Sequence, residues 1–174
     1  MDIKALQRPL REAYEADPAS APLTLRVRSA LSDLADPLHC AVTPDSTPDV
    51  TWRSGAHPAV GGTGDVPCSG DLLLAALAAC QEVTLRMVAA NQEIELLDVR
   101  VEVEGDWDPR GTLAMGREFP IGLTAIRCRT SVRVGADVNE QRAARLLKSA
   151  ERYCVVLNTL RAGMDVQSEF SLER

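Results

Sequence analysis

Aromatic residues are scarce in this sequence: Trp, Tyr and Phe together make up 3% of its 174 residues, although the hydrophobic content is 45%. A chain of this length is about one domain, and such a domain buries roughly 70% of the surface that its unfolded chain exposes. With so few rings, the core must consist of leucine, valine and alanine, which fill less volume per residue. We therefore expect burial through oligomerisation to add to stability.

The sequence lacks the features that are typical of nucleic-acid-binding, membrane and secreted proteins. The net charge of −6 argues against nucleic-acid binding, which needs a basic surface. No apolar run reaches membrane-spanning length, and the N-terminal residues lack the apolar core of a signal peptide. We expect a cytoplasmic protein with no membrane contact.

Metal and phosphate sites are not indicated either. The sequence contains neither a CxxC nor an HExxH motif, and its two histidines are His39 and His57. His39 adjoins Cys40, but no further ligand stands at the spacing of a zinc site. The GGTG segment at residues 61–64 lacks the lysine and the spacing of a phosphate-binding loop. We expect no metal and no cofactor.

Hydrophobic periodicity predicts three helices. The first covers residues 2–16 and ends before a proline. The second, capped by Ser69 or Asp71 and running to about Asn91, is apolar nearly all round and should lie at the centre of the fold. The third begins near residue 139, ends at residue 163 and carries Cys154 on its buried stripe.

Alternating patterns predict the strands. Acidic residues alternate with valines in residues 99–103, and arginines alternate with apolar residues in 126–134, which predicts adjacent antiparallel strands with paired charges. The resulting order of helices and strands predicts a layered α+β domain. The strands are expected at residues 23–27, 40–42, 50–52, 99–103, 126–134 and 166–172.

The five cysteines are an odd number in a chain without a secretory signal, so we expect free thiols rather than a structural disulfide framework. Cys80 and Cys154 each lie in the middle of an apolar helix. Cys68 precedes a helix start, where the backbone dipole favours thiolate. On this basis Cys68 and Cys80 are equal candidates for a reactive thiol, whereas Cys40 and Cys128 are expected to be small apolar residues of the interior.

Two segments resemble the OsmC/Ohr family of osmotically induced and organic-hydroperoxide-resistance proteins. The run GGTGDVPCSGDLLLAALAACQEVTL contains Cys80, and ERYCVVLNTL places Cys154 74 residues later. The GDWDPRGTL stretch at 105–113 is also similar to OsmC-like members. The resemblance covers roughly residues 23–172, so the chain divides into an N-terminal helical extension (1–22) and an OsmC-like domain (23–174).

The resemblance implies a fold and a chemistry. The fold would be α+β, with antiparallel sheets around long central helices in an intertwined homodimer. The chemistry would be reduction of organic hydroperoxides: Cys80 attacks the peroxide and becomes a sulfenic acid, Cys154 condenses with it, and a dithiol reduces the disulfide. Cys80 and Cys154 would then be the catalytic residues, whereas Cys68 has no counterpart in the well-studied members of the family.

The sequence departs from the family at three positions. Gly70, followed by Asp71, stands where the family usually has its catalytic glutamate, so Asp71 is the third predicted site residue. The family's arginine would align near Pro37, and the nearest arginines are Arg28 and Arg53. Val155 follows the second cysteine, where the family often has proline. Because no guanidinium is expected beside Cys80, we expect burial to raise the pKa of its thiol.

Three functions follow as hypotheses. The first is a thiol-dependent hydroperoxide reductase that uses Cys80 and Cys154. The second is a non-catalytic dimer that binds a small apolar ligand. The third is a redox sensor in which Cys68 forms a disulfide with Cys80 or Cys40.

Overall fold

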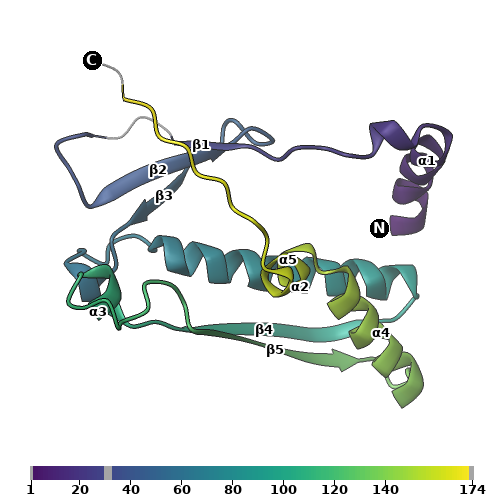
Figure 1. The fold of residues 1–174 in the computed structure, drawn as a ribbon. Coiled ribbons are helices and arrows are strands. Elements are labelled where there is room, and N and C mark those ends of the chain that lie inside the picture. Colours follow the sequence, from purple (N-terminus) through teal and green to yellow (C-terminus); the bar gives the residue numbers. More distant parts are fainter. Residues whose placement is uncertain (1, 30–32, 173–174) are drawn as a thin grey trace.

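The computed structural model describes residues 2–29 and 33–172 (Figure 1). Residue 1 of the predicted extension and residues 173–174 of the predicted domain lie outside this range. Short 3₁₀ turns lie at Pro18–Ser20 and Pro58–Val60. The helices are α1 (Ile3–Ala16), α2 (Ser69–Asn91), α3 (Pro109–Thr112), α4 (Glu140–Tyr153) and α5 (Val155–Ala162), and the strands are β1 (Val27–Ser29), β2 (His39–Pro44), β3 (Trp52–Gly55), β4 (Leu96–Asp106) and β5 (Ala125–Val134).

The strands form two antiparallel sheets, one on each side of α2. The first has the order β1-β2-β3, and the second is the pair β4-β5. Figure 1 shows α2 between them, with α4 and α5 beside it, and α2 packs against β4, α4 and α5. This arrangement confirms the predicted α+β class with antiparallel sheets around a long central helix.

The charges across β4 and β5 pair as the alternation predicted. Glu104 lies opposite Arg127 in the register of the two strands. Arg127 binds both Glu104 (3.1 Å) and Asp106 (2.6 Å), and Arg129 also reaches Glu104 (2.9 Å). The exposed face of this hairpin is therefore a ladder of opposite charges.

The N-cap of α2 lies one residue before the predicted cap Ser69 and three before the alternative, Asp71. The cap is Cys68, whose sulfur accepts a hydrogen bond from the N–H of Asp71 (3.4 Å). The Asp71 carboxylate in turn accepts from the N–H of Cys68 (2.9 Å), so the two residues satisfy each other's free N–H groups. The predicted cap Asp71 thus contributes from the first turn, and the predicted end of the helix at Asn91 is confirmed.

Within the described chain, α2 buries a single face. Its buried side chains are Leu77, Gln81, Leu85 and Ala89, and the last two join Ile94, Leu146 and Ala150 in the core. On other faces of α2, Leu73 is 41% and Val83 53% exposed, although both are apolar. α2 has the length and composition of a membrane-crossing helix, a test that core helices of soluble proteins also pass. Within one chain, α2 is therefore central in the fold, as predicted, but is buried on one face only.

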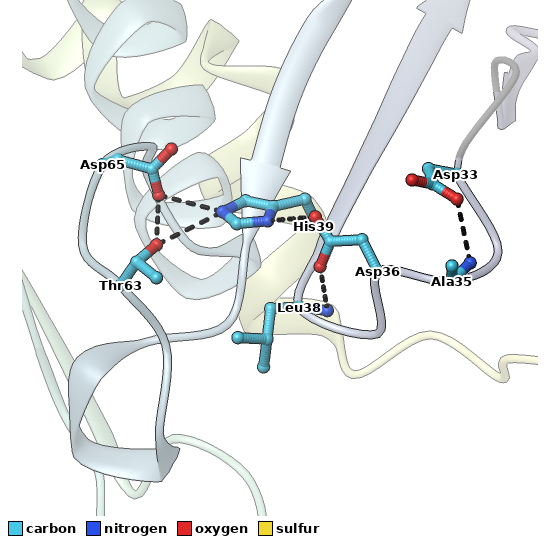
Figure 2. Close-up of polar contacts among 7 residues, drawn as sticks. All are labelled: Asp33, Ala35, Asp36, Leu38, His39, Thr63 and Asp65. Carbon is cyan, nitrogen blue, oxygen red and sulfur yellow. Dashed lines mark hydrogen bonds and ion pairs between the residues drawn. The ribbon is translucent and has the colours of Figure 1, made fainter.

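A histidine ties the three-stranded sheet to the loop that leads into α2 (Figure 2). His39, at the start of β2, binds Asp36 through Nδ1 (2.7 Å) and Asp65 through Nε2 (2.9 Å). Thr63 donates to Asp65 from the same loop. Since both ring nitrogens face carboxylates, the imidazolium form fits this site best. The pKa of His39 is raised by its hydrogen bonds to Asp65 and Asp36.

Two predicted strands differ from the structure. The strand expected at 23–27 is reduced to β1, which begins at Val27. The segment 166–172 has no regular structure, and Val166, Phe170 and Leu172 are more than four-fifths exposed. A strand needs a neighbour for its backbone hydrogen bonds, and the described chain places none beside this segment.

Candidate thiol site

The structure brings Cys80 and Cys154 together. Cys80 lies in the middle of α2, and Cys154 is fully buried at the joint between α4 and α5. Both are free thiols, and each is among the groups that shift the pKa of the other. The pairing predicted from the two apolar segments is thus present in one chain.

The joint at Cys154 corrects the prediction of one continuous helix from residue 139 to 163. Asn139 caps α4, which agrees with the helix start predicted near this residue, and Gly163 ends α5 with a φ of 60°. Between them, the backbone of Cys154 turns out of the helical region (φ −72°, ψ 105°). Cys154 is therefore the last residue of one helix and the cap of the next.

Hydrogen bonds lower the pKa of Cys80 against the effect of burial. Burial raises this pKa, but the backbone N–H of Val156, the thiol of Cys154, the hydroxyl of Thr84 and the N–H of Val155 all favour the thiolate, and their sum prevails. The expectation that burial would dominate and raise the pKa of Cys80 is therefore wrong. Backbone amides at the start of α5 take the place of the missing guanidinium.

The pKa of Cys154 is shifted in the opposite direction. Burial raises it most, and the hydrogen bond to Cys80 raises it further, while the N–H of Leu157 acts against both. The pair therefore has one thiol whose pKa is lowered and one whose pKa is raised. This is the polarity that an attacking thiol and a resolving thiol require.

The third predicted site residue, Asp71, is not part of this pair. Its carboxylate is bound to the N–H of Cys68 at the start of α2. Nine residues of helix separate it from Cys80, which amounts to about 13 Å along the axis. Cys68 lies roughly 18 Å from Cys80 by the same measure, whereas a disulfide requires Cα atoms within about 7 Å. A Cys68–Cys80 bridge within one chain would therefore require α2 to unfold.

The two arginines nearest the expected family position lie on the three-stranded sheet. Arg28 in β1 pairs with Asp45 at 3.0 Å, and Arg53 lies in β3. Among the described residues, the groups with the largest effect on the pKa of Cys80 include no arginine. The thiolate therefore relies on hydrogen bonds rather than on an ion pair.

Two cavities lie near the thiol pair, although neither Cys80 nor Cys154 is among the described residues that line them. One, of about 610 Å³, is lined by Leu77 and Gln81 beside Cys80 and by Leu157 beside Cys154, together with Cys128. The other, of about 960 Å³, lies between α1, α2 and α4 and is lined by Thr84, Met87 and Tyr153 among others. Each cavity is thus lined by a residue that adjoins one of the thiols in the sequence: Gln81 follows Cys80, and Tyr153 precedes Cys154.

Sequence reasoning missed three contributors to this site. Thr84 and Asn158 stand four residues after Cys80 and Cys154, a spacing that places side chains on one helix face. The N–H of Val156 had no signal in the sequence, because the apolar stripe continues through the break. Asn158 in a helix interior was a usable sign, since asparagine prefers caps and turns.

Comparison with known proteins agrees with this fold. A family model described as OsmC-like protein matches residues 62–169, which is more than half of the chain. No curated protein sequence matches the chain. Solved structures with similar folds include three bacterial proteins that share 16–22% of their residues with this chain at aligned positions.

The structural matches cover most of each molecule. An OsmC-like protein from Mycoplasma pneumoniae has a TM-score of 0.63 at 17% identity, covering 81% of this chain and 89% of its own. An organic hydroperoxide resistance protein OsmC from Legionella pneumophila has a TM-score of 0.59 at 22% identity, covering 84% of this chain and 96% of its own. An organic hydroperoxide resistance protein from Elizabethkingia anophelis has a TM-score of 0.58 at 16% identity, covering 82% of this chain and 91% of its own. At these identities the matches show the shared fold.

Proposed function

Because the chain belongs to the family of OsmC-like proteins, we propose that it reduces organic hydroperoxides, with Cys80 as the attacking thiol and Cys154 as the resolving thiol. The observation that carries this proposal is the pairing of two free thiols whose pKa values are shifted in opposite directions. The names of two structurally similar proteins, which refer to organic hydroperoxide resistance, support the same chemistry.

The proposed reaction has three steps. The Cys80 thiolate attacks the terminal oxygen of ROOH, the O–O bond breaks, and the alkoxide takes a proton to leave as ROH. The resulting sulfenic acid condenses with the thiol of Cys154, which forms the disulfide and releases water. A dithiol then reduces the disulfide by thiol–disulfide exchange and is itself oxidised to a disulfide.

The lining of the two cavities suits an organic peroxide. Leucine side chains line the smaller cavity, together with the ion pair of Glu151 and Arg161 (2.8 Å). An apolar R group would gain burial there while its peroxide end approaches the thiols. Hydrogen peroxide has no such group and should be the poorer substrate.

The working form is proposed to be a homodimer. The single chain exposes large apolar side chains on α2 and in the C-terminal segment: Leu73 and Val83 on the former, and Val166, Phe170 and Leu172 on the latter. Apolar surface of this extent usually marks an interface. A second copy packed on α2 would supply the burial that an aromatic-poor core lacks.

Two further proposals complete the assignment. Asp71 acts through the start of α2, where it secures the cap beside Cys68, rather than by touching the peroxide. The protein operates in the cytoplasm, where a reducing environment keeps all five cysteines as thiols between turnovers.

The decisive experiment maps the disulfide formed by limiting peroxide. Purified protein is treated with one equivalent of cumene hydroperoxide, and its peptides are analysed by mass spectrometry without reduction. A Cys80–Cys154 bridge is expected, together with loss of peroxide turnover with dithiothreitol in Cys80→Ser and its retention in Cys40→Ser, since Cys40 is exposed in β2. A folded protein that consumes no peroxide overturns the proposal, and a bridge containing Cys68 would establish the sensor instead.

A further inference from the structure

The break between α4 and α5 releases backbone N–H groups in the first turn of α5, among them those of Val155 and Val156. In an uninterrupted α-helix each N–H bonds to the carbonyl four residues earlier. Val155 would then donate to the carbonyl of Glu151, and Val156 to that of Arg152. The turn at Cys154 (ψ 105°) prevents both bonds, so these N–H groups and carbonyls need other partners.

The side chain of Asn158 occupies the two carbonyls. Its Nδ2 lies 3.1 Å from the carbonyl oxygen of Arg152 and 3.4 Å from that of Glu151. It also lies 2.8 Å from the carbonyl oxygen of Cys154. One amide group from the second turn of α5 thus substitutes for the N–H groups that a continuous helix would have provided.

The released N–H groups lie in the first turn of α5, which packs against α2, the helix that carries Cys80. The backbone N–H of Val156 and that of Val155 both favour the Cys80 thiolate. The two residues that lose their helical acceptors are thus the ones whose N–H groups lower the pKa of Cys80, while the amide of Asn158 binds the carbonyls of Glu151 and Arg152.

We propose that Asn158 is the positioning residue of the thiol site, which holds the helix open at Cys154 and thereby aims the N–H groups of Val155 and Val156 at Cys80. This inference rests on the proposed function for its biological meaning, but its geometry concerns the thiol alone. Without the side-chain donor, the carbonyls of Glu151 and Arg152 would compete with Cys80 for these N–H groups. The helix would tend to close, and the thiolate would lose its donors.

The first test measures how Cys80 ionises when Asn158 changes. The rate of Cys80 alkylation by iodoacetamide is followed from pH 5 to 11 by mass spectrometry of the Cys80 peptide. Asn158→Leu, which keeps the size but removes the donor, should react about tenfold more slowly at pH 7, since hydrogen bonds to charged groups are strong. At high pH, where the thiol is fully ionised in both proteins, the rates should converge.

Two companion variants separate positioning from general damage. Asn158→Gln keeps an amide donor and should recover part of the lost rate at pH 7. Thr159→Val, at the next and also exposed position, should leave the pH profile unchanged. A profile of Asn158→Leu identical to that of the parent overturns the inference, and so does a rate reduced by the same factor at every pH.

A second measurement needs no change at Asn158, and so remains decisive if those variants do not fold. In the parent protein, the amide resonances of Val155 and Val156 should shift with pH at the same midpoint as the ionisation of Cys80. In Cys80→Ala this titration should disappear. Val155→Pro removes one donor while keeping a residue suited to a helix start, and should slow alkylation at pH 7 by about twofold. Amide resonances that do not respond to Cys80 would overturn the inference.

These readouts are independent of peroxide turnover. If Asn158 controls the ionisation of Cys80 but the protein reduces no hydroperoxide, the proposed function fails and the positioning role stands. If the protein reduces hydroperoxides and Asn158→Leu does so with an unchanged pH profile, the positioning role fails and the function stands.

Discussion

The hydroxyl of Thr84 lies 4.0 Å from the sulfur of Cys80, one turn further along α2. Either group can donate when both are protonated, but only the hydroxyl can donate to the thiolate. Thr84→Val keeps the shape and removes this donor, so alkylation of Cys80 at pH 7 should slow by about two- to threefold. Thr84→Ser should react like the parent. Equal rates for the valine and serine variants would show that the hydroxyl plays no part.

Asp71→Ala should reduce stability without slowing the thiol. The carboxylate holds the N–H of Cys68 at 2.9 Å and lies at the positive end of α2. Losing this cap should lower the free energy of unfolding by about 1 kcal/mol in urea titrations. The alkylation rate of Cys80 should stay within about twofold of the parent's, because the two residues are roughly 13 Å apart along the helix. A large loss of Cys80 reactivity in a folded Asp71→Ala protein would instead assign the carboxylate a direct catalytic role.

The cluster around His39 should give stability a two-sided pH dependence. The pKa of His39 is raised by Asp65 and Asp36, so its contribution is complete below the ordinary value of 6.5 and is lost as the pH rises through the folded value. The pKa of Asp65 is lowered to about 2 by hydrogen bonds from Thr63 and His39, so its contribution is present above 3.8 and is lost as the pH falls towards 2. Urea unfolding should therefore show the largest benefit of this cluster between these limits.

Substitution of the histidines checks the origin of this dependence. His39→Gln should flatten the fall in stability above pH 6.5, while His57→Gln should retain it. With only two histidines in the chain, their ring resonances can be assigned from these variants. A His39 midpoint at or below that of free histidine would contradict the ion-paired arrangement in Figure 2.

Val83→Glu should convert the proposed dimer into monomers. Val83 is 53% exposed on α2 in the single chain, and a second copy on this face would enclose it. Burying an unpaired carboxylate there should weaken association by at least about 100-fold, as seen by light scattering over a range of concentrations. Ala144→Glu, at an exposed position of α4, is the control and should keep the parent's mass. A parent protein that is monomeric at all concentrations would refute the dimer.

Much of the fold followed from local patterns. The end of α2, the pairing of β4 with β5 and the start of a helix near Asn139 were predicted because each depends on residues close together in sequence or on a simple alternation. The strand expected at 166–172 was not found. Its alternating apolar residues indicate one apolar face, but they do not indicate which other segment would form the backbone hydrogen bonds of a sheet with it.

The sequence alone determined that Cys80 and Cys154 are the two thiols to consider, since each lies in an apolar segment whose motif and spacing resemble one family. It could not determine how Cys80 ionises, and burial by itself predicted the wrong direction. Only the tertiary structure decided that, because the donors are backbone N–H groups of Val155 and Val156, freed by a break that apolar periodicity does not register. Backbone groups carry no side-chain signature, so their effect on a distant thiol appears only when the chain has folded.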